Sequence, residues 1–195
     1  MMKIMMIGLG LMMMGNFAYA QSANSTKASE KGNASTSSKT SSAPPKAKNT
    51  SEKPLAQPGA ALPSFAFLTS DEKVYFDSNL RKNTPVILVL FNPSCGHCME
   101  VAISMKSRIN ELAGADIVFL TGNNLLAELP SFIQQTRFHD MPNVYVGIDH
   151  SDVSKSLFEY NGIPQIMVYN QQHILLKTYY KQMELDEIVR LIRSE

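Results

Sequence analysis

The stretch VILVLFNPSCGHC, residues 86–98, joins an apolar run to the only two cysteines of the 195-residue chain. Four of the six residues 86–91 are β-branched or aromatic, which predicts a strand buried on both faces. Beyond residue 96 the apolar period changes to three and four residues, which predicts a helix over 96–113 with Gly114 as its stop. Cys95 therefore lies where a buried strand gives way to a helix.

This placement of the cysteine pair favours redox chemistry. The first turn of a helix has unpaired backbone N–H groups and a partial positive charge, and both favour thiolate over thiol. The thiolate is the nucleophile of disulfide exchange. Cys98 lies about one helical turn beyond Cys95, close enough to close a disulfide with it. We expect Cys95, at the exposed end, to form the mixed disulfide and Cys98, turned toward the protein, to resolve it.

The residues between the cysteines are Gly96 and His97. A histidine beside both sulfurs stabilises the thiolate, and the disulfide then becomes easier to reduce. The other interpretation of His97 is an exposed spacer residue, and the sequence leaves both open.

Strands and helices alternate over the remaining residues of 62–195, a length that suits a single domain. A hairpin is expected from 65–68 and 74–76, strands at 116–120, 143–148, 166–169 and 174–180, and helices at 125–137, 153–158 and 183–194. Pro130 is expected to split the helix at 125–137 or to reset its start. This order predicts an α/β sandwich with a mixed sheet.

Residues 91–98, following a β run, resemble the active site of the thioredoxin superfamily, and Gly96-His97 is the dipeptide of protein disulfide isomerase domains. Gly162-Ile163-Pro164 before a strand is similar to the Gly-Ile-Pro of thioredoxins. The resemblance implies a thioredoxin-like three-layer sandwich with a redox disulfide between Cys95 and Cys98 and no cofactor. It also implies a cis bond at Ile163–Pro164, where the two residues shape a substrate groove.

The early hairpin and the extra helical segment near 125–137 resemble the exported TlpA- and ResA-like reductases. Several positions depart from the family pattern. Val89 stands where thioredoxins have a buried acid, Ser94 replaces the usual Trp, and Gln165 replaces the Thr after the proline. Glu100 is near the place of a family glutamate but one position off, and a solvated surface charge is its preferred interpretation. The proton acceptor for Cys98 is therefore not assigned from sequence.

The first 61 residues are expected to lie outside the folded domain. Residues 1–20 combine a basic start, an apolar run and Ala18-Tyr19-Ala20, which is the pattern of an export signal. Cleavage after Ala20 and retention as an anchor both stay open. Residues 21–61 are rich in Ser, Lys and Pro and carry six Lys against two Glu, which predicts a disordered linker. The protein is then periplasmic or otherwise extracytoplasmic.

A cysteine pair of this kind has three alternative functions besides redox exchange. A structural disulfide over four residues constrains the unfolded chain little. A copper-chaperone-like metal site would use Cys95, Cys98 and one histidine, taken from His97, His139 or His150. Copper chaperones of this fold have a Cys-x-x-x-Cys motif, and the spacing in this chain is one residue too short. Peroxiredoxins have Pro and Thr ahead of their peroxidatic cysteine, and Asn92-Pro93-Ser94 does not supply that pattern.

The sequence therefore predicts an extracytoplasmic thiol–disulfide oxidoreductase with Cys95 and Cys98 as its catalytic residues and no metal. Its expected partners are cysteine-containing exported proteins and a membrane redox protein that recharges the dithiol. Nucleic acid is not expected, because the linker lysines have no interleaved aromatic residues. Reductase, oxidase and isomerase activity are not distinguished.

Overall fold

The computed structural model describes residues 55–159 and 161–194. The export signal expected at 1–20 and most of the linker expected at 21–61 lie outside these residues. The strands are Ala66–Thr69 (β1), Val74–Phe76 (β2), Val86–Leu90 (β3), Asp116–Thr121 (β4), Val144–Asp149 (β5), Gln165–Tyr169 (β6) and Leu175–Tyr180 (β7). The helices are Gly96–Ser107 (α1), Leu129–Thr136 (α2), Val153–Leu157 (α3) and Leu185–Arg193 (α4). Across these described ranges, no helix is both long enough and apolar enough to span a bilayer.

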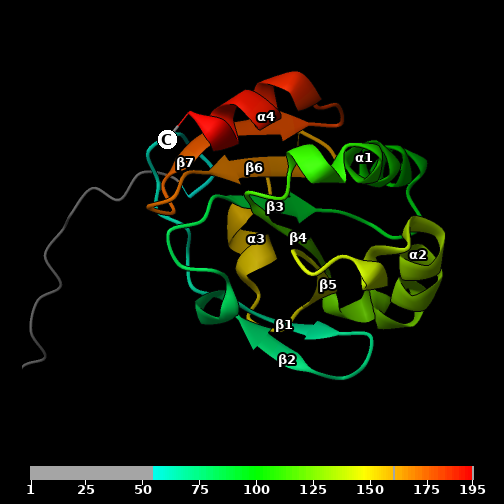
Figure 1. The fold of residues 1–195 in the computed structure, drawn as a ribbon. Coiled ribbons are helices and arrows are strands. Elements are labelled where there is room, and N and C mark those ends of the chain that lie inside the picture. The colour runs from blue at the N-terminus through cyan, green and yellow to red at the C-terminus, as the bar shows by residue number, and fades with distance from the viewer. Residues whose placement is uncertain (1–54, 160, 195) are drawn as a thin grey trace, which may run out of the picture. The chain divides into compact units, whose positions relative to one another are not determined.

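The strands form one mixed sheet in the order β2-β1-β5-β4-β3-β6-β7, which Figure 1 shows from β2 at the bottom to β7 at the top. Strands β3, β4 and β5 are parallel to one another, and the hairpin β1–β2 and the pair β6–β7 are antiparallel additions at the two sides. The predicted α/β fold with a mixed sheet and an early hairpin is confirmed. Central strand β3 is buried at all five positions, as its run of apolar residues predicts.

Helices cover the two faces of the sheet unequally. Alternate residues of β3 point to opposite faces, so that Val89 packs toward α1, α2 and α4 while Leu88 and Leu90 pack toward α3. The larger apolar cluster, on the face of α1, includes four phenylalanines whose rings lie 4.6–6.1 Å apart, Phe91, Phe119, Phe132 and Phe138. This cluster supports the start of α1, where the cysteines lie.

The bounds of helix α1 and of the segment at 125–137 differ from those that the sequence predicted. Helix α1 ends at Ser107 and a separate 3-10 turn follows, so the prediction that it runs to 113 with Gly114 as its stop was wrong. Apolar residues of the 3-10 turn and its end, Ile109 and Leu112, continue the spacing that had suggested one helix. The segment at 125–137 divides into a 3-10 stretch at 123–128 and α2, with Pro130 in the first turn of α2.

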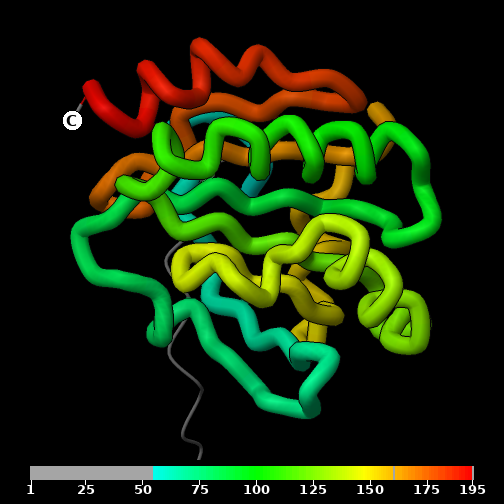
Figure 2. The backbone as a smooth tube through the Cα atoms, turned by 45° about the vertical axis from the view of Figure 1, so that its right-hand side comes forward, coloured from blue at the N-terminus to red at the C-terminus, as the bar shows by residue number. Residues whose placement is uncertain are grey.

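Residues 55–61 belong to the folded domain, although the sequence placed them in the linker. Gly59 donates its backbone N–H to the carbonyl of Leu175 at 2.7 Å, and Leu175 donates to Ala60 at 2.7 Å. Ala56 and Ala60 are buried. Figure 2 shows this segment, in cyan, beside the orange strands β6 and β7. Small alanine side chains suit this close approach, and composition alone does not separate them from a linker.

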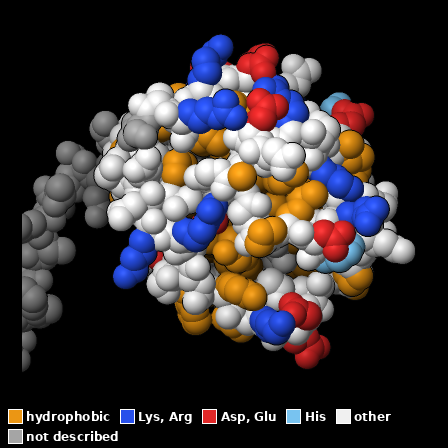
Figure 3. Space-filling view, viewed as in Figure 1, with side chains coloured by type: hydrophobic (Ala, Val, Ile, Leu, Met, Phe, Trp, Pro, Cys, Tyr) orange, Lys and Arg blue, Asp and Glu red, His pale blue; other side chains and the backbone are white. Residues whose placement is uncertain are grey.

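The outer edge of the sheet is apolar on one side. Val74 and Phe76 on β2 are 46% and 50% exposed. Figure 3 shows apolar side chains at the surface in the lower part of the face in view, where Figure 1 places β1 and β2. The backbone N–H of Phe76 is already bound to the side chain of Asn79 at 2.8 Å, which reduces the capacity of this edge to pair with another strand.

Candidate active site

Cys95 is the N-cap residue of α1, in extended conformation. Its N–H donates to the carbonyl of Asn92 at 3.1 Å, and its own carbonyl accepts the N–H of Met99 at 3.1 Å, the first bond of the helix. The side chain is half-buried, so its sulfur is open to solvent on one side. The sequence prediction that Cys95 lies between a buried strand and a helix start is confirmed.

Cys98 lies one turn into α1 and is 1% exposed. Burial raises the pKa of the Cys98 thiol to about 12; a hydrogen bond with the Cys95 side chain acts in the same direction, and one with the backbone of Asn92 acts against it. Both cysteines are free thiols. Both sulfurs thus lie within the first turn of α1, one half-buried and one buried.

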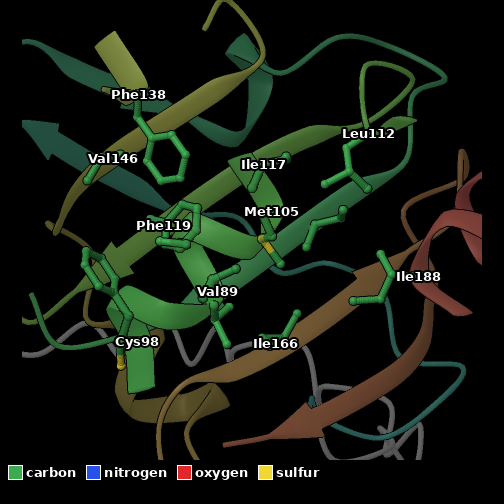
Figure 4. Close-up of a cluster of buried hydrophobic side chains, with 14 of the residues drawn as sticks. Val89, Cys98, Met105, Leu112, Ile117, Phe119, Phe138, Val146, Ile166 and Ile188 are labelled. Atoms are coloured by element: carbon green, nitrogen blue, oxygen red, sulfur yellow. The ribbon is translucent and has the colours of Figure 1, made fainter. Parts of the chain in front are cut away.

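The surroundings of Cys98 are apolar. It belongs to the same buried cluster as Val89, Phe91 and Val101, and Figure 4 shows it at one end of that cluster. Val89, at the position of the family's buried acid, is fully buried and faces α1. No carboxylate from β3 therefore reaches Cys98. The proton acceptor for Cys98, which the sequence left unassigned, is not supplied by this strand.

A carboxylate reaches the motif from another direction. Ser94, the residue before Cys95, donates its N–H to the side chain of Asn92 at 2.8 Å and its hydroxyl to Glu128. Glu128 is the residue directly before α2. Sequence reasoning did not find Glu128, because it lies 34 positions from Ser94 and no local motif marks it.

The Ile163–Pro164 peptide bond is cis, as the resemblance implied. Strand β6 begins at the next residue, and the register pairs Gln165 with Leu90 at the end of β3. The segment leading to Cys95 and the cis-proline loop therefore leave the sheet side by side. Gln165 is fully buried and holds its loop by donating to the carbonyl of Leu157 and accepting the N–H of Glu159, each at 2.8 Å.

Gly162, in the same loop, has a φ of 109°, a conformation that favours glycine. A Cβ at this position would lie 2.3 Å from the Cε atom of Lys181. Lys181 also donates its N–H to the carbonyl of Pro164 at 2.8 Å. The end of β7 thus braces the loop against the sheet.

A cavity of about 300 Å³ lies between the two loops and α3. Asn92 of the cysteine loop and Ile163 of the cis-proline loop both line it. Its other walls come from the ends of β3 and β4 and from α3, through Leu90, Phe91, Leu120, Thr121, Gly122, Leu125, Ser154, Lys155 and Phe158. The cysteine loop and the cis-proline loop thus share a mainly apolar cavity, although neither cysteine is among its lining residues.

The remaining site candidates are on the surface. Gly96 and His97 are exposed in the first turn of α1, and a side chain at position 96 would meet no atom within 4 Å. Glu100 is also exposed on α1, in agreement with its interpretation as a surface charge. The role of His97 in tuning the sulfurs stays a prediction.

Two of the three histidines of the alternative metal site lie in other parts of the fold. His139 lies in a 3-10 turn at 138–140, where it pairs with Asp140, and His150 follows β5. His97 lies between the two cysteines in the first turn of α1. Within 55–159 and 161–194, no three side chains of His, Cys, Asp or Glu form a group that could hold a metal ion.

No family model matches the chain, and no curated protein sequence does. Solved structures do match. A secreted disulfide oxidoreductase of Mycobacterium tuberculosis homologous to Escherichia coli DsbE is 16% identical, with a TM-score of 0.54 over 67% of this chain and 96% of its own. This chain has a thioredoxin-like fold.

Two further matches show how widely this fold is used. Peroxidoxin BcpB of Mycobacterium tuberculosis is 15% identical, with a TM-score of 0.58 over 70% of this chain and 96% of its own. ScoI of Arabidopsis thaliana, solved with copper bound, is 15% identical, with a TM-score of 0.53 over 70% of this chain and 100% of its own. At such identities the likeness shows the thioredoxin-like fold alone, and the activity has to be argued from the site.

Proposed function

We propose that this protein is an extracytoplasmic thiol–disulfide oxidoreductase that exchanges a Cys95–Cys98 dithiol and disulfide with cysteines of exported proteins. The observation that carries the proposal is the unequal exposure of two thiols in contact. Cys95 is reachable at the start of α1, and Cys98 is 1% exposed and hydrogen-bonded to it. A nucleophile that meets the substrate and a protected thiol that resolves the product are what disulfide exchange requires.

The reaction follows in two steps when the protein acts as a reductant. The Cys95 thiolate attacks a substrate disulfide, forming a mixed disulfide and releasing one substrate thiolate. Cys98 then loses its proton and attacks the Cys95 sulfur, which forms the Cys95–Cys98 disulfide and releases the second substrate thiolate. Two electrons pass to the substrate, and its two thiolates take up the protons. The reverse sequence oxidises a substrate dithiol.

The substrate is proposed to lie along the cis-proline loop. Ile163 and Asn92 line the same cavity, whose other walls are the ends of β3 and β4 and helix α3. An extended segment around the substrate cysteine would contact Ile163 and Pro164 while its sulfur meets Cys95. The apolar lining fits a chain that is recognised by shape and by apolar side chains, which agrees with a protein substrate.

The export signal proposed for 1–20 and the linker proposed for 21–54 support an extracytoplasmic site of action. In such compartments protein disulfides form and persist, so substrates of a dithiol enzyme are available. A membrane redox protein is the proposed source of recharging electrons or oxidant. The first 20 residues would then be either removed on export or kept as a tether.

Trapping of mixed disulfides tests the proposal. Cys98→Ser removes the resolving thiol, so partners attacked by Cys95 stay bound through a disulfide that a reductant releases. Cys95→Ser is the matched control, and it should trap no partner by the same route. Equal recovery of partners with both variants would contradict the assigned roles. Titration of the reduced protein with Cu(I) and Zn²⁺ separates the metal-binding alternative, which requires a stoichiometric site beyond the two thiols.

A further inference from the structure

The contact between Ser94 and Glu128 joins the cysteine loop to the start of α2. Ser94 is held on its other side by the bond from its N–H to Asn92. Its hydroxyl donates to one carboxylate oxygen of Glu128. A negatively charged group is therefore fixed at the residue that precedes the nucleophile, although none lies beneath the motif on β3.

The position of Glu128 is set by the core. Leu129, the next residue, is fully buried, and Phe132 one turn later is 1% exposed. The ring of Phe132 lies 4.6 Å from that of Phe91, which ends the apolar run leading to the motif. The packing of Phe132 against Phe91 thus holds the start of α2 beside the cysteine loop, where the Glu128 side chain reaches Ser94.

The charge of Glu128 is not neutralised by an ion pair. None of the ion pairs among residues 55–159 and 161–194 involves it. Its side chain is half-buried, where screening by solvent is weaker than at a fully exposed site. Two other titratable side chains near the motif, His97 and Glu100, are exposed on α1. Lys155 of α3 lines the cavity that Asn92 also lines, and it is paired with Asp152.

We propose that Glu128, held by Ser94, sets the redox equilibrium of the Cys95–Cys98 pair and makes its disulfide harder to reduce. The inference rests on the proposed dithiol function. Breaking the disulfide gives sulfurs that can take up negative charge, whereas the disulfide is neutral. A carboxylate bound to the residue before Cys95 disfavours that charge by Coulomb repulsion. The carboxylate therefore favours the disulfide. Glu128 acts through this charge and makes no bond to substrate, so it is a positioning and tuning residue.

Two substitutions separate the charge from the tether. Glu128→Gln removes the charge but keeps an oxygen that accepts the Ser94 hydroxyl. Ser94→Ala removes the hydrogen bond but keeps the charge. Glu128→Asp keeps the charge on a shorter side chain, and Glu100→Gln removes the same charge from an exposed position of α1.

The measurement is the equilibrium of each variant with reduced and oxidised glutathione at pH 8, read by mass spectrometry of the alkylated thiols. In this reaction the protein disulfide and two glutathione thiols give the dithiol and one glutathione disulfide. We expect Glu128→Gln to raise the equilibrium constant for reduction about threefold to tenfold. Glu128→Asp and Ser94→Ala should stay within about twofold of the wild type, and Glu100→Gln within about 1.5-fold.

The outcomes distinguish the role of Glu128 from the proposed dithiol function. Equal constants for Glu128→Gln and the wild type would overturn the inference while leaving the dithiol function intact. A shift of the same size in Ser94→Ala would assign the effect to loop geometry and would also overturn it. A wild-type protein that forms no Cys95–Cys98 disulfide at any glutathione ratio would instead remove the proposed function itself.

Discussion

Cys95 and Cys98 are one helical turn apart, yet their surroundings differ in almost every respect. Cys95 caps α1, is half-buried, and follows a serine that is bound to a carboxylate. Cys98 is 1% exposed in an apolar cluster with Val89 beneath α1. The order strand, loop, helix thus gives two chemically identical residues different surroundings. Cys95 lies partly at the surface, and Cys98 is buried in the core.

The largest expected effect concerns the reactivity of Cys98 alone. In Cys95→Ser the single remaining thiol is buried, and burial is the main cause of its raised pKa, which is about 12 against an ordinary 9.0. A raised pKa keeps the thiol protonated to higher pH. At pH 8 we expect Cys98 in the folded protein to react with iodoacetamide at least about 100-fold more slowly than in the unfolded chain, because burial remains when the smaller contribution of the Cys95 side chain is removed.

The pH profile provides the check on this prediction. The alkylation rate of the folded Cys95→Ser variant should continue to rise about tenfold per pH unit beyond pH 9, where the unfolded chain in guanidinium levels off. Protonation of Cys98 favours the folded reduced state, so that contribution to stability is present below pH 9 and is lost as pH rises toward 12. A folded-state rate that levels off near pH 9 would show that the core does not protect Cys98.

A second substitution makes the surroundings of Cys98 polar and so reduces the difference between the two cysteines. Val89→Asp places a carboxyl group where thioredoxins have one, in a fully buried position. We expect the free energy of unfolding to fall by about 3 kcal/mol, measured by urea denaturation of the reduced protein. The new base should also speed the attack of Cys98 on a Cys95–glutathione mixed disulfide.

Val89→Asn is the matched control for the acid. It has a similar size and also buries a polar group, so its stability should fall to a similar extent. It offers no proton acceptor, and the release of glutathione should therefore stay near the wild-type rate. Identical release rates in the Asp and Asn variants would mean that proton removal does not limit resolution by Cys98.

The smallest expected effect is on the exposed side, at His97. Its position in the first turn of α1 is open to solvent, where charge effects are screened. His97→Ala should lower the equilibrium constant for reduction by glutathione about twofold, because a group that stabilises the thiolate is lost. A tenfold change, or any change in the opposite direction, would contradict the role of an exposed tuning residue.

The parts of the site that the sequence predicted are those encoded by short segments. The apolar run at 86–91 and the change of period after Gly96 located Cys95 at the start of a helix, and Gly162-Ile163-Pro164 marked the second loop. The end of α1 was misplaced because Ile109 and Leu112 keep helical spacing while packing from a 3-10 turn. Local periodicity does not distinguish these two arrangements.

The contact between Ser94 and Glu128 could not be predicted from the sequence for a different reason. It depends on how α2 packs against the cysteine loop, through Leu129 and Phe132 in the core, and not on any pattern within either segment. The same holds for Gln165, whose buried amide is matched by partners six and eight positions away. Tertiary packing decides such contacts, and a single sequence carries no direct sign of them.

Redox titration of the full chain in glutathione buffers tests the central claim most directly. The account predicts one two-electron transition in which a disulfide forms between Cys95 and Cys98. Its potential should lie closer to that of protein disulfide isomerase, about −180 mV, than to that of thioredoxin, about −270 mV. Absence of the Cys95–Cys98 disulfide across the titration, or a potential below the thioredoxin value, would contradict it.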